Sequence, residues 1–366
     1  TSSGGQQNMT EKKVQDITEQ TWKDEAFPEW GTWLNEEIDR TKVPEGKFRL
    51  WWLVNMGYWL KTDHQTNIVM DLWCGTGKQT YDKPDMSPRH QWSRLTGGRT
   101  IQPNLRAQPM VIDPFKIHHL DAYLCTHFHH DHIDENVAAA LLKGVKEEIP
   151  FIGPQYVVDQ WIAWGVPADR CQVVKPGNSI KIKDVEIDVT DSFDRSALIS
   201  DPNKNVQPPM DEVPDDMDKR AVNYVMKTDA GTIYDAADSH YSAYFAKHGK
   251  DFDVDVAICA YGENPVGIQD KMTSIDVLRT AEALDAKVVI PMHWDVWTNM
   301  LGDPNEIELL WKYRRERFGY KFYPFSWMPG GHFTYPDDMK KLQYYHQRGF
   351  KDRYTHPIEL PYKAFL

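Results

Sequence analysis

The feature that most constrains this chain is a cluster of histidines that follows an apolar segment. His127, His129, Asp131 and His132 stand close together, with a further histidine between the two pairs. The apolar run 117–125 leads into them, and a helix-like pattern over 133–145 leads out. If the strand continues through the cluster, His127 and His129 point to one side, because side chains alternate along a strand. The pattern predicts a metal site at a strand-to-helix turn.

The residue types in this cluster also indicate which metals it suits. Neutral imidazoles and a carboxylate bind Zn²⁺, Mn²⁺ or Fe²⁺. Closed structural zinc sites usually use thiolates, and residues 127–132 include no cysteine. We therefore expect a catalytic site.

Length and charge narrow the possible functions. The chain has 366 residues, of which 41% are hydrophobic, so it can bury a large core in one large or two medium domains. Its formal net charge of −12 repels long polyanions and anionic membrane surfaces. We expect no nucleic-acid partner and no membrane partner, and a small anionic substrate would need local Lys, Arg or backbone N–H groups.

Cysteine use and the chain start bear on location. The 4 cysteines show no short paired spacing, which favours reduced thiols in a cytosol. We find no signal-peptide pattern and no apolar run of about 18 residues. We therefore expect a cytoplasmic protein. Residues 1–10 resemble an expression-tag remnant, and the rest of the chain, 11–366, is expected to form one domain with additions at both ends. A homo-oligomer is expected, although the sequence does not define the number of subunits.

The order of predicted elements indicates the fold class. Strands are expected first, at 47–61 with a break near 55–57, and at 66–73. Strands then alternate with helices, and the pattern recurs in the second half; the further strands are expected at 117–125, 150–153, 172–189, 221–227, 232–236, 254–261, 287–292 and 322–335, and the helices at 33–40, 133–145, 155–164, 274–284 and 304–318. This order predicts an α/β fold with two mixed sheets face to face and helices outside, an αββα sandwich. Residues 80–110 and 199–219 are expected to form loops.

Three later strand ends carry further candidate ligands. Asp191, Asp238 and His293 each follow a hydrophobic strand pattern where it meets a polar turn. Rigid strand ends of this kind hold active-site residues in many folds. For each residue alone, a capping Asp or a surface His is the stronger alternative, but together with the first cluster they predict a two-metal site.

This set of residues resembles the metallo-β-lactamase superfamily. Its H-x-H-x-D-H motif is matched by His127-Phe-His-His-Asp-His132, its later Asp by Asp238 and its last His by His293. The resemblance implies an αββα sandwich with the metal site at one edge.

One departure from the superfamily pattern bears on the metal. The superfamily usually has another His between the first motif and the later Asp, but 185–197 contain none. Asp191 or Asp194 could take its place, and Asp191 is the candidate we assign. A carboxylate there shifts the expected metal from Zn²⁺ toward Mn²⁺, with one or two ions per chain.

The chain also resembles, over longer blocks, the L-ascorbate-6-phosphate lactonases. The blocks that carry this resemblance run from near the N-terminus to 364–366: 27–31, 72–79, 102–106, 151–154, 191–195, 238–241, 261–264 and 270–274. The resemblance implies a cytoplasmic hydrolase that depends on a divalent metal, with manganese favoured. Its reaction is opening of the lactone ring to give 3-keto-L-gulonate 6-phosphate.

Roles follow from the resemblance as expectations. One ion is expected at His127, His129 and Asp191, and the other at Asp131, His132 and His293, with Asp238 between them. The catalytic candidates are Asp131, Asp238 and His240, where His240 is either a proton donor or a residue outside the reaction.

The substrate also needs groups for its phosphate and its ring. The phosphate candidates are Arg195, Lys78, Arg106 and Lys271, with N–H groups of the 75–77 glycine loop. Tyr261 and Asn264 are the candidates for the ring. For each cation except Arg195, a solvated surface charge is the stronger alternative.

Two other functions remain open on sequence alone. A metal-dependent phosphodiesterase or nuclease uses the same motif, because a fold does not fix a function. A metabolite sensor that has lost catalysis is the other, because one histidine ligand is missing.

Overall fold

The computed structural model describes residues 12–26, 28, 33–78, 104–199, 217–264, 270–297 and 300–344. The proposed tag and parts of both predicted loops lie outside these ranges. Within them, no helix has the length and apolar character needed to cross a membrane.

The first sheet has a meander on one side and a parallel run on the other. Its strand order is β16-β1-β2-β3-β6-β7-β8. The strands are β1 (Phe48–Trp52), β2 (Tyr58–Thr62), β3 (Asn67–Met70), β6 (Ala122–Leu124), β7 (Phe151–Gly153), β8 (Cys171–Val173) and β16 (His332–Tyr335). Pairing is antiparallel from β16 to β3 and parallel from β3 to β8. The carboxyl ends of β3, β6 and β7 therefore share one edge.

The second sheet repeats this plan, in the order β15-β14-β13-β12-β11-β10-β9. Its strands are β9 (Ser179–Ile182), β10 (Val185–Asp191), β11 (Val222–Lys227), β12 (Thr232–Asp235), β13 (Val256–Ala260), β14 (Val288–Met292) and β15 (Tyr323–Pro324). Pairing is antiparallel from β9 to β12 and parallel from β12 to β15. A separate ribbon pairs β4 (Gly77–Lys78) with β5 (Asn104–Leu105).

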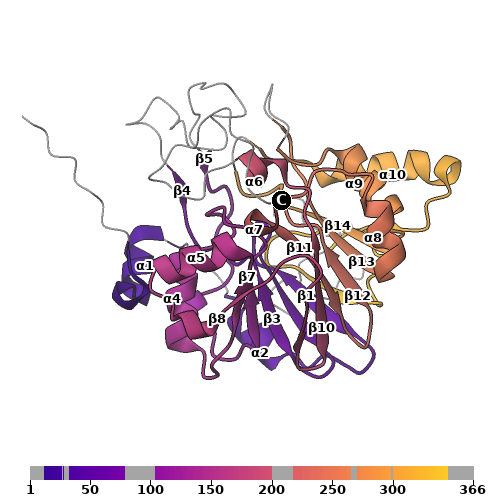
Figure 1. Ribbon diagram of the computed structural model, residues 1–366. Helices are drawn as coiled ribbons and strands as arrows, with labels where there is room; N and C mark the ends of the chain where they lie inside the picture. The colour runs from indigo at the N-terminus through magenta and orange to yellow at the C-terminus, as the bar shows by residue number, and fades with distance from the viewer. Residues whose placement is uncertain are drawn as a thin grey trace, which may run out of the picture.

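Helices cover the outer faces of both sheets (Figure 1). On the first sheet lie α1 (Glu19–Ala26), α4 (Glu135–Gly144) and α5 (Gln155–Ala163), and on the second lie α8 (Phe245–Phe252), α9 (Ser274–Ala283) and α10 (Pro304–Phe318). The shorter helices are η1 (Val14–Asp16), α2 (Asn35–Arg40), η2 (Pro114–Lys116), η3 (Ala168–Arg170), α6 (Arg195–Ile199) and α7 (Met217–Arg220).

Alternation along the strands builds two cores. In β1, Leu50 and Trp52 belong to the core between the sheets, whereas Trp51 packs with the outer helices. Because both faces of β1 are buried, its sequence is apolar at almost every position. The αββα prediction is thus confirmed.

Two details of the predicted elements need correction. The strand before the histidines ends at Leu124, so it does not continue through His127. Hydrogen bonds from Thr126 to Asp71 turn the chain away from the sheet there. Helices α1 and α8 were not predicted. Each has only eight residues and two buried side chains, so even the amphipathic α8 spans too few turns for its period to stand out in the sequence.

Candidate metal centre

The histidine motif is held by a carboxylate from the neighbouring strand. Asp71 follows β3, and its two carboxylate oxygens accept the Thr126 N–H (2.8 Å) and the Thr126 hydroxyl (2.7 Å). Its Oδ2 atom also lies 3.0 Å from Nδ1 of His132. All three residues are buried. Asp71 thus fixes the start and the end of the motif.

The same contacts determine which nitrogen each ring presents. The Thr126 hydroxyl donates its one hydrogen to Asp71, so it accepts the Nδ1–H of His127 at 2.8 Å. His132 donates its Nδ1–H to Asp71. In both rings Nε2 is therefore the nitrogen that faces the site. Metal-binding histidines are usually oriented in this way, by a hydrogen bond from the ring nitrogen that does not bind the metal.

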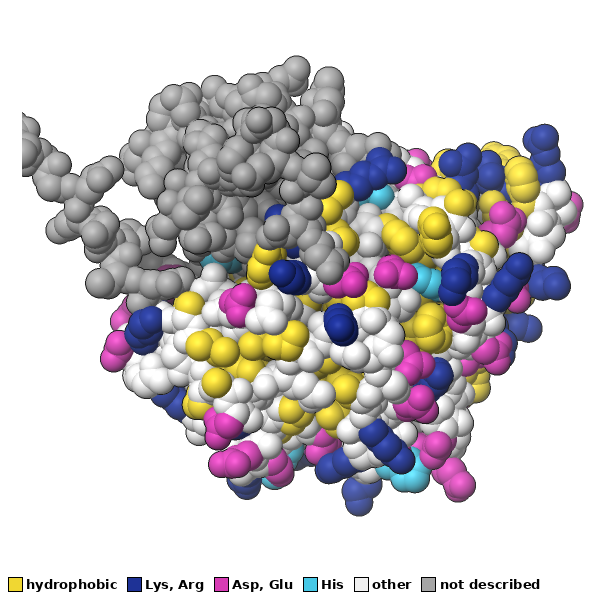
Figure 2. All heavy atoms as spheres, in the orientation of Figure 1, with side chains coloured by type: hydrophobic (Ala, Val, Ile, Leu, Met, Phe, Trp, Pro, Cys, Tyr) yellow, Lys and Arg dark blue, Asp and Glu magenta, His cyan; other side chains and the backbone are white. Residues whose placement is uncertain are grey.

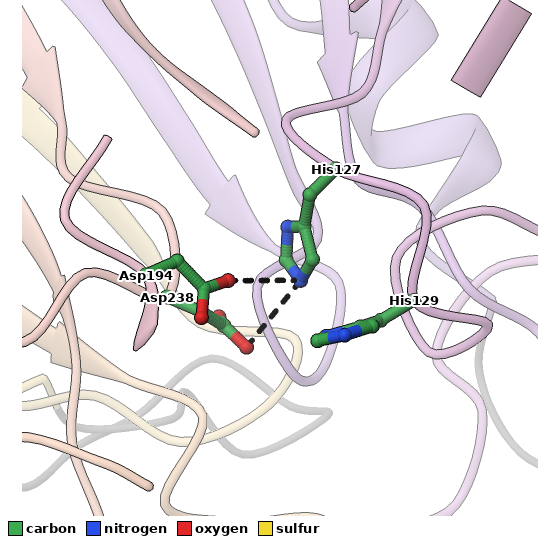
Figure 3. A group of neighbouring side chains, drawn as sticks. All are labelled: His127, His129, Asp194 and Asp238. Atoms are coloured by element: carbon green, nitrogen blue, oxygen red, sulfur yellow. Dashed lines mark ion pairs between the residues drawn. The ribbon is translucent and has the colours of Figure 1, made fainter. Parts of the chain in front are cut away.

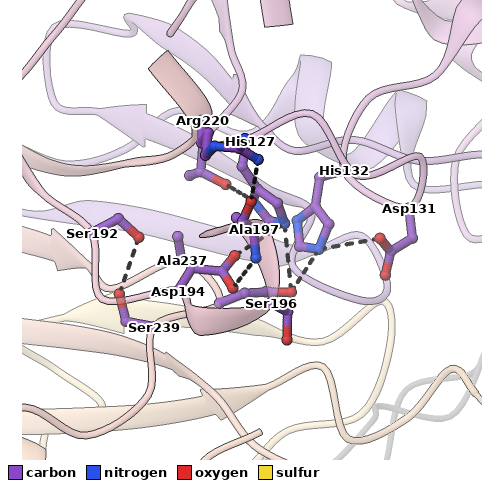
Figure 4. A network of polar contacts seen from close by, with 12 residues as sticks. His127, Asp131, His132, Ser192, Asp194, Ser196, Ala197, Arg220, Ala237 and Ser239 are labelled. Atoms are coloured by element: carbon purple, nitrogen blue, oxygen red, sulfur yellow. Dashed lines mark hydrogen bonds and ion pairs between the residues drawn. The ribbon is translucent and has the colours of Figure 1, made fainter. Parts of the chain in front are cut away.

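Strand ends of the second sheet complete the site. Asp238 follows β12, and His293 follows β14 with a left-handed backbone (φ 71°). Asp194 lies between β10 and α6, where its Oδ1 atom accepts the Ala197 N–H at 2.9 Å (Figure 4). Its Oδ2 atom then points to His127. Figure 3 shows His127, His129, Asp194 and Asp238 converging from different loops.

The resulting His/Asp cluster contains two adjacent groups of possible metal ligands, which share no residue. The groups are His127, His129, Asp194 and Asp238, and Asp131, His132 and His293. In each group the ligand atoms lie within 4.8 Å of one another.

The distances in the cluster fit ions better than hydrogen bonds. Nε2 of His127 lies 3.6 Å from both Asp194 Oδ2 and Asp238 Oδ2. Nε2 of His293 lies 3.4 Å from Asp238 Oδ2. Ligand atoms about 2.0–2.2 Å from a shared ion stand roughly 3–3.6 Å apart, so these spacings match a common ion.

Unsatisfied buried atoms support the same conclusion. Among the described residues, His127 Nε2, Asp194 Oδ2, Asp238 Oδ1 and both ring nitrogens of His293 are buried without a hydrogen bond. Such atoms are costly unless something else binds them. The residues present therefore fit divalent metal ions.

Protonation in the cluster follows burial and charge. Burial, and then His132, hold the pKa of His127 well below its usual value, and burial lowers the pKa of His129 to about 4. Burial, and then Asp238, raise the pKa of Asp194 to about 8. Burial lowers the pKa of His132, but Asp238 and Asp131 raise it more, so the net shift is upward. The carboxylates thus attract positive charge, which a metal ion supplies.

Asp191, our sequence candidate, lies outside the cluster. Its side chain is 61% exposed and its Oδ2 atom lies 3.7 Å from His248. Asp194, the alternative considered from sequence, has the place in the cluster that we assigned to Asp191. The sequence prediction assumed that the ligand stands at the end of the strand. Strand β10 does end at Asp191, but the chain reaches the cluster only in the following turn, which contains Asp194.

Two supporting residues of Asp131 were not predicted. Trp297 donates its indole N–H to Asp131 Oδ2 at 3.2 Å, and Asn55 donates its side-chain N–H to the Asp131 carbonyl at 2.7 Å. Asn55 has a left-handed backbone (φ 58°), and its carbonyl accepts the His293 N–H at 3.3 Å. No sequence pattern pointed to either residue as part of the site. Asp71 could have been found, because it follows an apolar strand as Asp238 does.

Lys271 lies at the cluster rather than on a separate surface. Its Nζ atom donates to Asp270 Oδ2 at 2.8 Å and lies 3.6 Å from Asp238 Oδ2. Burial lowers the pKa of Lys271, but Asp270 and Asp238 more than offset this effect, so the pKa lies above its usual value and the ammonium stays charged.

Other predicted substrate residues are occupied by structural contacts. Arg106 donates to the backbone carbonyls of Gln108 (2.8 Å) and Gly75 (3.0 Å). The Asn264 side chain holds the backbone of 270–271, and the Tyr261 hydroxyl donates to the Asp303 carbonyl at 3.0 Å. These contacts position loops near the site.

Of the two remaining phosphate candidates, the structure describes the side chain of Arg195 but not that of Lys78. The Arg195 side chain is exposed, directly after Asp194. Its backbone N–H donates to Nδ1 of the buried His240 at 3.3 Å. Lys78 belongs to β4, but its side chain is outside the described part of the chain.

Comparisons with known proteins agree with this geometry. The model of the family "Beta-lactamase superfamily domain" matches residues 92–294. A relative from Escherichia fergusonii, named "Probable L-ascorbate-6-phosphate lactonase UlaG", is 52% identical over 354 residues, 97% of this chain and 99% of the relative. Relatives with the same name from Escherichia coli and Salmonella newport show the same identity and coverage.

Solved structures share the fold at low identity. Igni18, a metallo hydrolase from Ignicoccus hospitalis, has a TM-score of 0.53 and 17% identity, covering 79% of this chain and 98% of its own. An isothiocyanate hydrolase from Delia radicum gut bacteria has a TM-score of 0.56 and 17% identity, covering 78% and 98%. The chain belongs to the beta-lactamase superfamily and, within it, to the UlaG family that its 52% identical relatives represent.

Proposed function

We propose that this protein hydrolyses the lactone ring of L-ascorbate 6-phosphate to 3-keto-L-gulonate 6-phosphate, using a divalent metal. The observation that carries this proposal is a full His/Asp cluster in a chain 52% identical, over 97% of its length, to relatives named for that lactonase. In the reaction, water oxygen bonds to the lactone carbonyl carbon, the bond from that carbon to the ring oxygen breaks, and the ring oxygen takes a proton. The enediol of the opened chain then tautomerises: its 3-hydroxyl loses a proton and carbon 2 gains one, which gives the 3-keto product.

The proposed metal ligands fall into the two groups of the cluster. One ion would lie among His127, His129, Asp194 and Asp238, and another beside Asp131, His132 and His293. Bound ions supply Lewis acidity, which polarises a carbonyl group and makes water a stronger acid. Asp194 in place of a further imidazole favours Mn²⁺ over Zn²⁺.

The chain's own residues would orient the site and supply a proton. Asp71 and Thr126 fix the rings of His127 and His132 before any ligand binds. His240 accepts a hydrogen bond at Nδ1, so its neutral ring carries the proton on Nε2. This makes His240 the candidate donor to the departing ring oxygen.

The phosphate would bind through cations beside the cluster. Arg195 is our first candidate, because it is exposed and next to Asp194, and Lys78 remains a second. Arg195→Ala is expected to raise KM for the phosphorylated lactone far more than for the unphosphorylated one. Equal effects on both would remove Arg195 from phosphate binding.

The test of the proposed function is turnover of L-ascorbate 6-phosphate by protein loaded with Mn²⁺ or Zn²⁺. A phosphodiester substrate measured alongside tests the alternative activity. His127→Ala and His293→Ala should each abolish turnover, and wild-type rates in these variants would contradict the metal scheme.

The proposal includes a cytoplasmic location and a small-molecule substrate, with nucleic acid excluded. Acidic and basic side chains are mixed over the described part of the face in Figure 2, which offers a polyanion no continuous basic track there. A homo-oligomer stays a prediction, for which light scattering is the measurement.

A further inference from the structure

Lys271 differs from the other cations near the site because it is buried and held rigidly. It is 3% exposed. Asn264 Oδ1 accepts the backbone N–H groups of Asp270 and Lys271, each at 2.8 Å, and Asn264 Nδ2 donates to the Lys271 carbonyl at 3.0 Å. The backbone that carries the ammonium is therefore fixed.

The side chain is aimed at the cluster by a second carboxylate. Asp270 is buried, accepts a hydrogen bond from the Ser196 hydroxyl at Oδ1, and accepts one from Lys271 Nζ at Oδ2. Nζ then lies 3.6 Å from Asp238 Oδ2, an atom in contact range of His132 and His293. A residue that only neutralised Asp270 would not need to reach Asp238.

The ammonium has capacity for another acceptor. It carries three N–H donors, and among the described residues Asp270 is its one hydrogen-bond acceptor. Leaving donors of a buried charge unsatisfied is costly. An oxygen of a molecule bound at the cluster would satisfy them.

The chemistry of the substrate indicates which oxygen that is. The ring enediol of ascorbate is acidic and is ionised at neutral pH, with its negative charge shared between the 3-oxygen of the enediol and the lactone carbonyl oxygen. The phosphate is several bonds away, on the side chain. A cation beside the metal ligands therefore meets the charged ring when the carbonyl is at the cluster.

We infer that Lys271 binds the ionised enediol oxygen of the lactone and makes the site select acidic lactones over saturated ones. This inference rests on the proposed function, and it moves Lys271 from our earlier expectation of phosphate binding to the ring. Drawing the ring charge onto the enediol oxygen also leaves the carbonyl carbon more open to attack by water.

The test compares Lys271→Met with Lys271→Arg and with Lys287→Met. Lys287 is the control for loss of a lysine–aspartate ion pair: it pairs with Asp255 at 2.9 Å, is exposed, and directly precedes β14, at the opposite end of that strand from His293. We expect Lys271→Met to lower kcat/KM for L-ascorbate 6-phosphate by about tenfold to a hundredfold. Lys271→Arg should recover part of the loss, and Lys287→Met should match wild type.

Selectivity is read from inhibition and from metal content. The inhibition constant of the saturated L-gulonolactone 6-phosphate should be unchanged by Lys271→Met, and metal measured by mass spectrometry should stay at the wild-type ratio. Loss of metal, or equal weakening of both phosphorylated lactones, would overturn the inference. If the saturated lactone does not inhibit wild type, unphosphorylated L-ascorbate decides, since a phosphate-binding lysine would leave its turnover unchanged.

Failure of the inference and failure of the proposed function are distinguishable. Wild-type protein that does not turn over L-ascorbate 6-phosphate refutes the proposed function. Wild-type turnover together with a fully active Lys271→Met variant refutes only the role of Lys271.

Discussion

At the scale of single residues, the site depends on which of two nearby acids reaches the cluster. Asp191 ends a strand and is exposed, whereas Asp194 is buried and its Oδ2 atom lies 3.6 Å from His127. Sequence alone weighed both and favoured the strand end. The acid that reaches the cluster is three residues beyond the end of β10, and its position is set by the turn that precedes α6.

Asp194→Asn and Asp191→Asn form a matched pair that tests this. Asn keeps an acceptor for the Ala197 N–H but loses the charge, so Asp194→Asn should lower turnover and metal affinity by about a hundredfold or more. Asp191→Asn should change both by less than about threefold. Chelator competition and steady-state rates measure the effects, and the reverse order would restore Asp191 as the ligand.

The raised pKa of Asp194, about 8, predicts a pH dependence of metal binding. Below that pH the metal-free carboxyl holds a proton that the ion must displace, so affinity should fall as pH falls from 8 to 6, by up to about tenfold per unit for this group. Calorimetry in buffers of different ionisation enthalpy counts the released protons. Asp194→Asn should release about one proton fewer per ion, and an unchanged count would contradict the assignment.

At the scale of elements, the β1–β2 turn supports the site as much as the histidine motif does. Asn55 in this turn bonds the Asp131 carbonyl, and its own carbonyl accepts the His293 N–H. Gly57 closes the turn where a Cβ atom would lie 3.1 Å from the Val54 carbonyl and 3.2 Å from that of Asp71. The packing of this turn therefore affects where Asp131 and His293 lie.

Gly57→Ala is expected to weaken both folding and metal binding, because backbone atoms on both sides must move. We expect a loss of about 1–3 kcal/mol in unfolding free energy and a lower metal affinity. Gly144→Ala is the control, since its Cβ would lie 3.2 Å from the carbonyl oxygens of Phe115 and Ile117, at the end of α4 that is farther from the histidine motif. It should lower the melting temperature and leave metal affinity unchanged; equal metal effects would contradict the coupling.

At the scale of the whole molecule, the proposed metal ligands come from both sheets. His127, His129 and His132 follow β6 of the first sheet, whereas Asp194, Asp238 and His293 follow strands of the second. An ion bound there joins the two sheets at one edge of the sandwich. Stability should therefore depend on metal.

Metal removal should lower the melting temperature. At a free ion concentration of about one hundred times the dissociation constant, binding stabilises the fold by about 2.7 kcal/mol, and chelation removes this. Differential scanning calorimetry with and without chelator measures the shift, and His119→Ala, at an exposed ion pair with Glu147, serves as a variant whose shift should equal that of wild type. An unchanged melting temperature on chelation would contradict metal bridging.

The sequence predicts the features of this protein that arise from residues close together in the chain, and it misses those that arise from contacts between distant residues. Alternating strands such as β9 and β10 and the capped helix α9 are local, so the sandwich follows from them. The motif and the strand ends at Asp238 and His293 also lie close to apolar runs. Asn55, Trp297 and the Asp270–Lys271 pair act through contacts far apart in sequence, which no local pattern contains.

The division of ligands between the two sheets also has a consequence for the order of folding. His127 precedes its partners Asp194, Asp238 and His293, so no nascent chain holds the whole set until β14 has been made. Contacts this distant in sequence form late, after the sheets have paired. Metal binding should therefore be the last step of folding, so that the ion slows unfolding and leaves the refolding rate unchanged.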